Sequence, residues 1–458
     1  MNLSDIKLLA VCDSPTLTTG FAKVANNLLR RFPLKPEQIH VWAIGFDGNG
    51  YDKVPWKLFP AGNPWHDPRH LFNLITSIYY GRYTHVWMLQ DLFHLSNEQF
   101  TKNLADACQA RVIPEIGERQ RTRTCCYFPV DAHWMPPEWL DILTRVDAAV
   151  AYTEFGKSVV LTADEARRKG SGGTRGKADE TSAPLLPLPL IRVIPHGVDT
   201  AVYHPLTEDR AALRAKMWQV GGKPWVQPGD FVMLNVNTNQ RRKDVTRSLE
   251  ILAGLKARQL PVKLVMHMAE KDDTTISLTR IGEQLGLQLG VDWLHHGQFF
   301  ERSACRSTMP EEELVKLYHA ADLVLTTTHG EGWGLSITEA LACGCPVALP
   351  THTACAEIYS QLEAQGMRGA LVPLPANETA PVLPFDNGLI RPRVNLDRAV
   401  ALLADRIIHP RGRVRLTPEA KEWLSWDRIA GEIWRAIAPD QPRLAGSNAT
   451  TTTERDER

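Results

Sequence analysis

Two successive series of short apolar segments, each alternating with amphipathic stretches, constrain the fold of this 458-residue chain more than any other feature. The first series predicts strands at Ile6–Asp13, Ile39–Phe46, His85–Leu89, Cys125–Val130, Ala148–Thr153 and Ile191–Pro195. The second predicts strands at Phe231–Thr238, Val262–Ala269, Trp293–Phe299, Leu323–Thr328, Pro346–Leu349 and Ala370–Pro373. Helical patterns fit between them, for example at Phe21–Phe32, Thr246–Arg258 and Glu311–Ala320. Because strands that alternate with helices form parallel sheets covered on both faces, we expect an α/β fold of two doubly wound, Rossmann-like domains that face each other across a cleft.

A segment rich in turn residues, Gly197–Pro205, separates the two series and sets the domain boundary. We expect an N-terminal domain at residues 1–198 and a C-terminal domain at residues 199–415. The stretch at about 163–189 is rich in Gly, Ser, Pro and basic residues, which predicts a mobile insertion. The polar tail at residues 440–458 is predicted to be disordered.

The charges of the chain balance, since Lys and Arg total 52 and Asp and Glu also total 52. This balance excludes a strong global attraction to nucleic acid or anionic membranes, although it leaves room for a local basic groove. The eight cysteines lack the spacing of a metal site, and we expect them to be reduced. We find neither a signal peptide nor an apolar run of membrane-spanning length, which favours a cytoplasmic protein with no integral membrane segment.

The segment LVLTTTHGEGWGLSITEALACGCPVALP, which begins at Leu323, combines a β-branched strand, a glycine-rich loop and the start of a helix near Ser336. Gly330, Gly332 and Gly334 allow this loop to approach a ligand closely. The free N–H groups and the positive dipole end of the helix attract an anion. We therefore expect the loop to hold a diphosphate without a metal ion.

Two carboxylates belong to this segment, Glu331 in the loop and Glu339 in the helix. Each can accept hydrogen bonds from two sugar hydroxyls, so the pair suits a hydroxyl-rich ligand. Ser336 and Glu339 also have the spacing of a helix capping box, which needs no ligand. The residues alone leave both interpretations of Glu339 open.

A basic run, Arg241–Lys243, follows the predicted strand Phe231–Thr238. Such a run is commonly a solvated turn. However, doubly wound sheets bind ligands beyond the carboxyl ends of their strands, where this run and the glycine-rich loop both lie. We therefore expect the basic run to supply positive charge to the same cleft.

In the form HGEGWGLSITEALACGCPV, the glycine-rich segment resembles the E-x7-E motif of retaining glycosyltransferases of family 4, the glycosyl transferases group 1, which have the GT-B fold. The resemblance implies that Glu331 contacts the hydroxyls of a donor sugar and that Glu339 binds the ribose of its nucleotide. Backbone N–H groups at the end of the loop would meet the diphosphate. The resemblance assigns further donor binding to Gly332, Trp333, Gly334 and Leu335.

The basic run resembles the phosphate-binding loop of the same family, which uses an Arg and, five residues later, a Lys. Lys243 matches the Lys. Thr238 occupies the Arg position, which departs from the family pattern, and Arg242 is the candidate replacement.

Two matches lie in the first half of the chain. Gly20 resembles the family's N-terminal glycine loop under the donor phosphates, although an ordinary turn capped by Thr18 or Thr19 fits as well. Family members often carry a His or Asp near the donor sugar in the loop where this chain has Asp131 and His133. Local hydrogen bonding in a Pro-rich turn is the alternative for these two residues.

Two further matches concern architecture. The segment IRVIPHGVDTAVYHP resembles the motif that joins the two domains of family members. The segment LSWDRIAGEIWRAI resembles the helix that returns to the first domain. We therefore expect residues 416–439 to cross back, with Trp426 as an anchor.

The resemblance implies a retaining transferase that moves a sugar from a nucleotide-diphosphate sugar to a hydroxyl acceptor by front-face attack. A UDP- or GDP-sugar is the expected co-substrate, with no metal ion and no other cofactor. The sequence does not determine the acceptor, for which a carbohydrate or another small molecule is favoured. The catalytic residues would be Glu331, Lys243, Asp131 and His133.

Three alternatives stay open. The basic run resembles sequences of phage and metagenomic relatives, and some phage transferases of this fold modify DNA, so a hydroxymethylated DNA base is a second possible acceptor. The absence of the family Arg at Thr238 would suit a non-catalytic protein that binds sugar nucleotides. An epimerase or phosphorylase of the same fold is the third. A DNA-binding channel would draw on Arg111, Arg119, Arg121, Arg123 and Arg167–Lys169.

Overall fold

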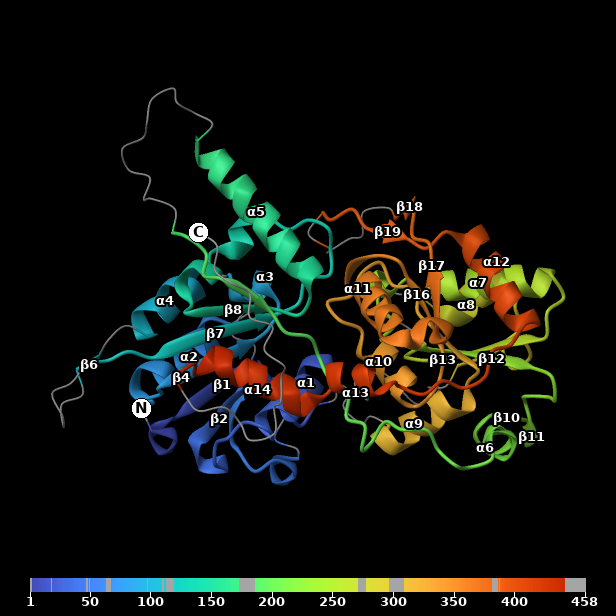
Figure 1. Cartoon of the computed structure of the whole chain (residues 1–458), viewed down its shortest axis with the longest axis horizontal. Helices are drawn as coiled ribbons and strands as arrows, with labels where there is room; N and C mark the ends of the chain where they lie inside the picture. The colour runs from blue at the N-terminus through green and yellow to red at the C-terminus, as the bar shows by residue number, and fades with distance from the viewer. Residues whose placement is uncertain are drawn as a thin grey trace.

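Two parallel sheets with helices packed against them form two domains that lie side by side (Figure 1). The structure is a computed structural model, and it describes residues 2–440 except 18, 47, 49, 63–66, 97, 109–110, 113–118, 173–185, 271–276, 296–308, 381–385 and 387.

Within the described residues, the N-terminal sheet has seven parallel strands in the order β3-β2-β1-β4-β7-β8-β9. The strands are β1 (Leu8–Asp13), β2 (Ile39–Ile44), β3 (Lys57–Ala61), β4 (His85–Leu89), β7 (Arg123–Phe128), β8 (Ala148–Ala151) and β9 (Ile191–Val193). The helices of this domain are α1 (Gly20–Leu29), α2 (Pro68–Tyr80), α3 (Leu92–Leu95), α4 (Glu98–Cys108) and α5 (Glu154–Gly172). A short antiparallel pair joins β5 (Arg111–Val112) to β6 (Arg119–Gln120). Strands β4 and β8 are buried along their whole length because both faces of the sheet are covered, which explains their continuous apolar runs.

The C-terminal sheet has six parallel strands within the described residues, in the order β14-β13-β12-β15-β16-β17. The strands are β12 (Phe231–Val236), β13 (Val262–His267), β14 (Trp293–His295), β15 (Leu323–Leu325), β16 (Val347–Pro350) and β17 (Leu371–Leu374). The helices are α6 (Arg210–Met217), α7 (Val245–Ala257), α8 (Leu278–Gln284), α9 (Glu311–Ala320), α10 (Leu335–Ala342), α11 (Thr353–Leu362) and α12 (Leu396–Ile408). Two short antiparallel pairs join β10 (Gln219–Val220) to β11 (Lys223–Pro224) and β18 (Glu378–Thr379) to β19 (Pro392–Arg393).

The predicted α/β architecture of two doubly wound domains is confirmed. Each predicted strand coincides with an observed strand to within three residues at either end, apart from residues 296–299, which lie outside the described part of the chain. Strand β3 was missed because its sequence KLFPA is short and contains Pro60. Proline is tolerated in a sheet mainly at an edge, and β3 is the edge strand of its sheet.

The predicted insertion at 163–189 needs a correction at its first part. Residues 163–172 are not irregular, because they continue α5 to its end at Gly172. Residues 173–185, like the tail at 441–458, lie outside the described residues.

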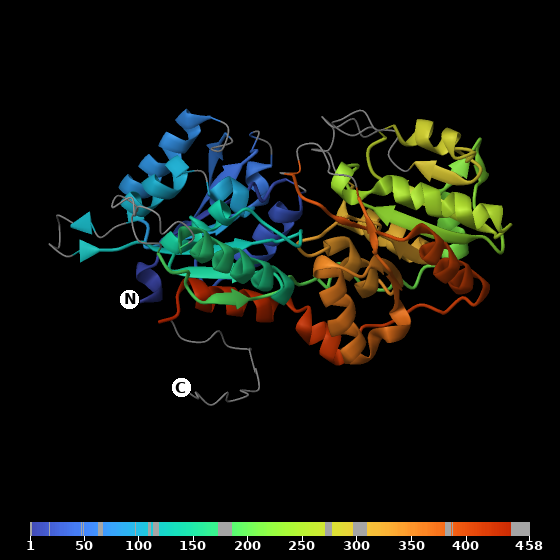
Figure 2. The same ribbon diagram turned by 90° about the horizontal axis from the view of Figure 1, so that it is seen from above.

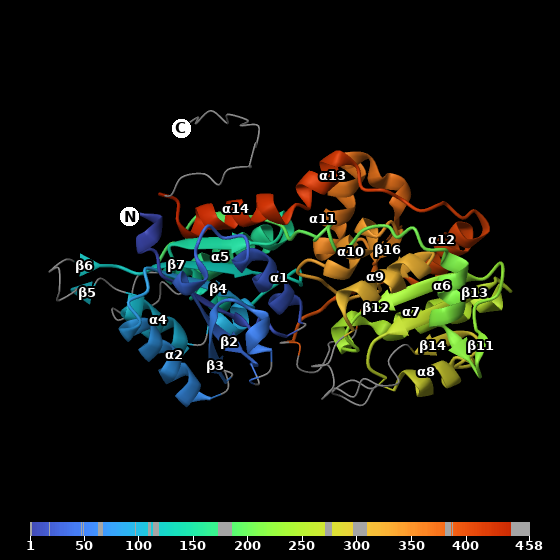
Figure 3. The same cartoon turned by 90° about the horizontal axis from the view of Figure 1, so that it is seen from below.

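The C-terminal helix α14 (Trp426–Ile437) lies against the N-terminal domain, and α13 (Pro418–Trp423) precedes it (Figures 2 and 3). Trp434 of α14 is 1% exposed, and its ring centroid lies 5.5 Å from that of Phe32. Trp426, at the start of the helix, is also buried, next to the linker residue His196 at 5.9 Å between ring centroids. Helix α14 therefore completes the core of the first domain.

Candidate functional site

A cavity of about 1670 Å³ lies between the two domains. Its walls come from the segments that follow β1, β4 and β7 in one domain and β12, β13 and β15 in the other. The strand order reverses between β1 and β4 and between β12 and β15, and doubly wound sheets bind ligands at such switch points. A pocket for one drug-sized ligand measures about 300–1,000 Å³, so this cavity has room for two substrates.

The glycine-rich loop between β15 and α10 lines this cavity. Helix α10 begins at Leu335, and Gly334 precedes it with a φ of +108°, a left-handed conformation that favours glycine. The first N–H groups of the helix have no partners within it, so they can serve an anion. The capping-box interpretation of Ser336 and Glu339 is wrong, because Gly334 takes the cap position without a side-chain bond and Glu339 lies in the second turn.

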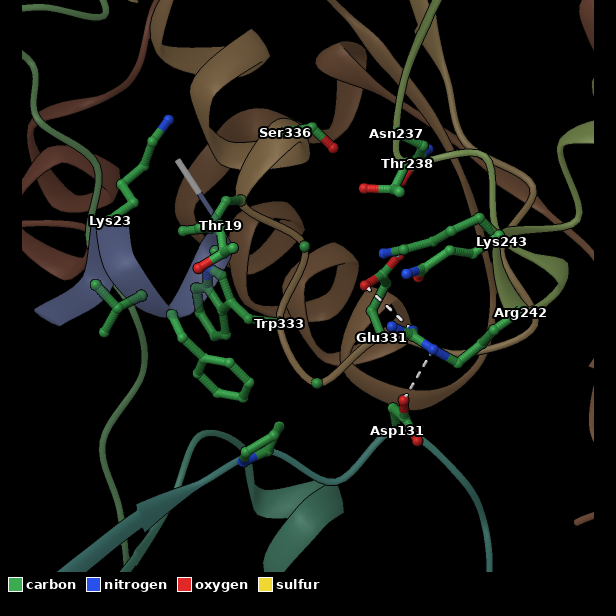
Figure 4. A pocket seen from close by; sticks show the side chains of 18 of the residues that line it. Thr19, Lys23, Asp131, Asn237, Thr238, Arg242, Lys243, Glu331, Trp333 and Ser336 are labelled. Carbon is green, nitrogen blue, oxygen red and sulfur yellow. Dashed lines mark hydrogen bonds and ion pairs between the residues drawn. The ribbon is translucent and has the colours of Figure 1, made fainter. Parts of the chain in front are cut away.

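Glu331 is buried in this loop and forms an ion pair with the basic run (Figure 4). Nζ of Lys243 donates a hydrogen bond to its Oε1 at 2.5 Å, and Nη1 of Arg242 lies 3.7 Å from its Oε2. Burial alone would raise the pKa of Glu331, but the charges of Lys243 and Arg242 outweigh burial and hold the pKa below its ordinary value. The carboxylate is therefore ionised and able to accept hydrogen bonds from a ligand.

Glu339 has two partners that the sequence did not reveal. Its Oε1 accepts a hydrogen bond from Nζ of Lys23 at 2.6 Å, and its Oε2 accepts one from the hydroxyl of Tyr318 at 3.1 Å. Lys23 belongs to α1 of the first domain, and its Nζ also lies 3.1 Å from Glu311. Lys23 and Glu339 both line the cavity, so a cation of one domain meets acids of the other at this end.

The basic run Arg241–Lys243 forms a 3-10 turn that is fastened to the glycine-rich loop. The carbonyl oxygen of Arg242 accepts a hydrogen bond from the N–H of His329 at 2.8 Å. The side chain of Lys243 is only 14% exposed, so this residue does not belong to a solvated turn. Thr238, which occupies the expected Arg position, is exposed on the same wall of the cavity (Figure 4). The replacement of the missing Arg by Arg242 stays a prediction.

Asp131 faces the basic run from the first domain. Its Oδ2 lies 3.2 Å from Nε of Arg242, and its Oδ1 accepts a hydrogen bond from Nη2 of Arg391 at 3.2 Å. Arg391 is 3% exposed, and it also donates to the carbonyl oxygen of Asp131 at 2.6 Å and to Asp386 at 2.5 Å. Burial raises the pKa of Asp131, but the two guanidinium groups outweigh it and lower the pKa overall. Arg391 precedes β19 and belongs to no motif, so sequence reasoning missed it.

Two glycines of the loop serve the contact between the domains. A Cβ on Gly330 would lie 1.9 Å from the carbonyl oxygen of Asp131, which no structure tolerates. A Cβ on Gly332 would lie 2.3 Å from Cβ of Pro129. The two domains therefore approach each other closely only because these positions have no side chain.

Gly20 and Leu335 face each other at another point of the cavity. Gly20 opens α1, and a Cβ there would lie 3.7 Å from Cδ1 of Leu335, an ordinary contact distance. Thr19 caps the helix, since its hydroxyl accepts the N–H of Ala22 at 3.1 Å. Thr19 therefore caps the helix while Gly20 lies beside the cavity, so the two interpretations of this turn do not exclude each other.

Trp333 borders the cavity but is 3% exposed. Its ring centroid lies 5.8 Å from that of His196 and 5.5 Å from that of Trp423. Its main contacts are therefore with the linker and with α13.

His133 is the one predicted catalytic residue that the structure does not bring to the cavity. It is exposed and is not among the residues that line the cavity, unlike its neighbours Asp131 and Trp134. Its ring packs 5.0 Å from that of Phe155. Partial burial of the ring and the positive charge of Arg391 lower the pKa of His133, which favours its neutral form.

Phe93, Trp134 and Asp91 are among the lining residues that the sequence analysis did not predict. Phe93 and Trp134 are 42% and 54% exposed. Asp91 follows β4, and burial, together with the charge of Asp131, raises its pKa to about 7. The end of the predicted strand His85–Leu89 could have pointed to Asp91, because ligands bind beyond the strand ends.

The basic residues expected to form a DNA channel do not line the cavity where the structure describes their side chains. Arg121 pairs with Asp147 at 2.6 Å, and the side chains of Arg167–Lys169 pair with acids of their own helix. The side chains of Arg111 and Arg119 lie outside the described part.

Among the described residues, no group of three His, Cys, Asp or Glu side chains could hold a metal ion. No helix in that part of the chain has the length and apolarity needed to cross a bilayer.

The two-domain architecture is that of solved glycosyltransferase structures. Sucrose-phosphate synthase from Thermosynechococcus elongatus is 14% identical, with a TM-score of 0.58 over 95% of this chain and 100% of that one. HepE from Anabaena, solved in complex with UDP-glucose, is 16% identical, with a TM-score of 0.54 over 94% of this chain and 96% of that one. The protein therefore has the GT-B fold.

The match to a family model lies within the second domain. Residues 223–380 match the family model of glycosyl transferases group 1. D-inositol 3-phosphate glycosyltransferase from Nocardia farcinica is 30% identical over 206 residues, which cover 42% of this chain and 37% of that protein. The same enzyme from Segniliparus rotundus is 30% identical over 161 residues, 34% of this chain and 31% of that protein. The match thus spans about a third of the length of these curated relatives. The matched segment 223–380, which contains Lys243, Glu331 and Glu339, is thus similar to the glycosyl transferases group 1.

Proposed function

We propose that the protein is a glycosyltransferase that moves a sugar from a nucleoside diphosphate sugar to a hydroxyl acceptor, with retention of anomeric configuration and without a metal ion. The observation that carries this proposal is the buried pair of Glu331 and Lys243 beside the N-terminus of α10, inside a cavity between two doubly wound domains. This arrangement puts a carboxylate for sugar hydroxyls and positive groups for a diphosphate into one cavity.

The positive groups answer the main electrostatic demand of the reaction. Cleavage of the donor leaves negative charge on the departing diphosphate, and fixed positive groups in a cavity stabilise that charge. Lys243, Arg242 and the N–H groups that open α10 supply such groups here. A bound diphosphate would share the two cations with their present acid partners, and Glu331 would accept hydrogen bonds from the sugar.

The proposed step is a front-face substitution. The bond between the anomeric carbon and the phosphate oxygen breaks, and a bond to the acceptor oxygen forms on the same face. The departing phosphate oxygen takes the proton of the acceptor hydroxyl. Asp131, held by Arg391 on the opposite wall, would bind a hydroxyl of one of the two substrates.

A UDP- or GDP-sugar is the donor that we propose. The structural neighbour HepE binds UDP-glucose, and this chain covers 96% of that protein with the same fold. UDP-glucose is therefore the first donor to test.

The test is a donor screen by thermal shift, followed by turnover. A bound donor stabilises the folded state, so the cognate nucleotide sugar should raise the melting temperature, whereas the free sugar should not. Release of nucleoside diphosphate that depends on an added acceptor should follow, with unchanged rates in excess EDTA. Proton NMR of the product should show the anomeric configuration of the donor.

Lys243→Met should abolish the thermal shift and the turnover, and the exposed Lys216→Met of α6 is the matched control. Full activity of Lys243→Met would contradict the site. A product of inverted configuration would contradict the mechanism, and a loss of turnover in EDTA would contradict metal independence.

A further inference from the structure

Aromatic side chains form part of the cavity wall in the first domain. Phe93 on α3 is 42% exposed and Trp134, after β7, is 54% exposed. Trp139 also lines the cavity, and its ring centroid lies 5.6 Å from that of Phe93. Exposed aromatic rings that gather in a concave site mark a binding surface. We call Phe93, Trp134 and Trp139 the aromatic wall.

The aromatic wall adjoins the place of the proposed donor sugar. Strands β4 and β7 are parallel neighbours, so the segments that carry Phe93 and Trp134 leave the sheet side by side. Asp131 belongs to the same loop as Trp134, and its carboxylate lies 3.2 Å from Arg242, next to Glu331. A molecule on the aromatic wall would therefore lie beside the sugar that Glu331 holds.

The charges around the aromatic wall are acidic. Asp91 directly precedes α3, and Asp131 comes three residues before Trp134. Among the described residues, the Lys and Arg side chains that line the cavity each pair with an acid. These pairs are Lys23 with Glu339 at 2.6 Å, Arg242 with Asp131 at 3.2 Å, Lys243 with Glu331 at 2.5 Å and Arg391 with Asp386 at 2.5 Å.

These pairings disfavour a negatively charged ligand on the aromatic wall. Arg242 and Lys243 belong to the donor side, and Arg391 is 3% exposed behind Asp131. A phosphate group on the aromatic wall would meet the ionised carboxylate of Asp131 and the carboxyl group of Asp91, and its negative charge would be repelled by Asp131 and would oppose ionisation of Asp91. A neutral molecule avoids this repulsion.

We infer that the aromatic wall is the acceptor subsite and that its ligand is an uncharged saccharide or cyclic polyol. Such a ring offers an apolar C–H face that packs on an aromatic ring. Its hydroxyls can hydrogen-bond to the carboxyl groups of Asp91 and Asp131, whether these are ionised or protonated. The role of the ligand as an acceptor rests on the proposed function, whereas its binding to the aromatic wall does not.

The test measures binding without a donor. Saturation-transfer NMR and calorimetry would compare methyl β-D-glucopyranoside and myo-inositol with glucose 6-phosphate, a myo-inositol phosphate and a short DNA duplex. We expect the neutral rings to bind at least about tenfold more tightly than their phosphorylated counterparts, a difference of about 1.4 kcal/mol. Trp134→Ala and Phe93→Ala should each weaken this binding by about tenfold, and Trp134→Phe should keep most of it.

Phe72→Ala is the matched control, since Phe72 is 69% exposed on α2 and does not line the cavity. Tighter binding of a phosphorylated ring, salt-sensitive binding of the duplex, or no binding of any neutral ring would overturn the inference. So would neutral binding that Trp134→Ala and Phe93→Ala leave unchanged. If neutral rings bind at Trp134 but no donor is turned over, the proposed function fails and the subsite survives. If turnover occurs without this binding, the inference alone fails.

Discussion

The two walls of the cavity differ in how their side chains are held. On the C-terminal wall, which we call the donor wall, Glu331 and Lys243 are buried and paired, and the helix N-terminus beside them is fixed by the fold. On the N-terminal wall, which carries the aromatic wall and Asp91 and which we call the acceptor wall, Phe93 and Trp134 are exposed. A rigid charged wall suits the diphosphate group that all donors of this class share, and an open aromatic wall suits a partner that differs between enzymes. Damage to the first wall should therefore abolish the reaction, and damage to the second should change its acceptors.

The largest effect should come from Glu331→Gln. The amide can no longer pair with Lys243 or accept from the sugar as a carboxylate does, and we expect kcat to fall by about 10²–10³-fold with every acceptor. Nucleotide release measures the loss, and the melting temperature checks the fold. Glu312→Gln, at an exposed position of α9, should keep full activity. Wild-type rates for Glu331→Gln would show that this carboxylate has no role in the reaction.

Gly330→Ala tests the contact between the walls. Its Cβ would collide with the carbonyl oxygen of Asp131, so the domains would be held apart. A misplacement of about 1 Å can cost about 10²-fold in rate, and we expect kcat to fall by that order while donor binding to the second domain changes little. Turnover assays measure kcat, and the thermal shift caused by the donor measures donor binding. Gly412→Ala is the control, because a Cβ at Gly412 would have no neighbour within 4 Å. Equal kcat values for Gly330→Ala and the wild type would show that the close approach of the two domains is not needed for turnover.

Arg242→Met should have an intermediate effect that falls on the donor wall alone. Loss of a charge-assisted contact of about 1.5–3 kcal/mol predicts a rise of about 10–100-fold in the KM for the donor. Thr238→Arg on the same background should restore much of this loss, because Thr238 lines the cavity at the family's Arg position. An unchanged KM in Arg242→Met, or no rescue by Thr238→Arg, would show that Arg242 does not replace the missing Arg.

The smallest effect should come from Asp91→Asn, on the acceptor wall, and it should depend on pH. Burial and the nearby charges of Asp131 and Asp13 outweigh Arg242 and raise the pKa of Asp91 to about 7, against about 4 in the unfolded chain. The folded state therefore holds a proton that the unfolded state has released, so stability falls as the pH rises through this window.

Asparagine does not ionise, so Asp91→Asn removes the free-energy cost of the charged carboxylate in the folded state at high pH. We expect its melting temperature to exceed that of the wild type by a few degrees at pH 8 and to equal it near pH 4. Calorimetry at both pH values checks this expectation. A larger gain at pH 4 than at pH 8 would contradict the sign of the shift.

The donor wall was predictable because its chemistry is local in the sequence. Glu331 and the glycines around it lie in one continuous segment, and Lys243 follows the end of a strand that the apolar pattern predicts. The rule that ligands bind beyond strand ends then places both segments at one edge of the sheet. The structure brings them within 2.5 Å of each other.

The residues that bridge the domains were not predictable in the same way. Lys23 meets Glu339 across 316 positions of the chain, and Arg391 meets Asp131 across 260. Neither cation belongs to a motif, and only the packing of the two domains brings them together. The capping-box interpretation of Glu339 failed for a local reason, because α10 begins at Leu335 with Gly334 as its cap and Glu339 therefore lies in the second turn.

The return of α14 to the first domain has a consequence for synthesis on the ribosome. Phe32 packs against Trp87 of its own domain and also against Trp434, which is translated only after the whole second domain. The first domain thus leaves the ribosome with part of its apolar core uncovered, and that part stays uncovered until α14 emerges. Such exposed surface invites aggregation during translation. A ribosome that stalls or terminates before Trp426 would therefore release both domains nearly complete, but with the first one unable to close its core.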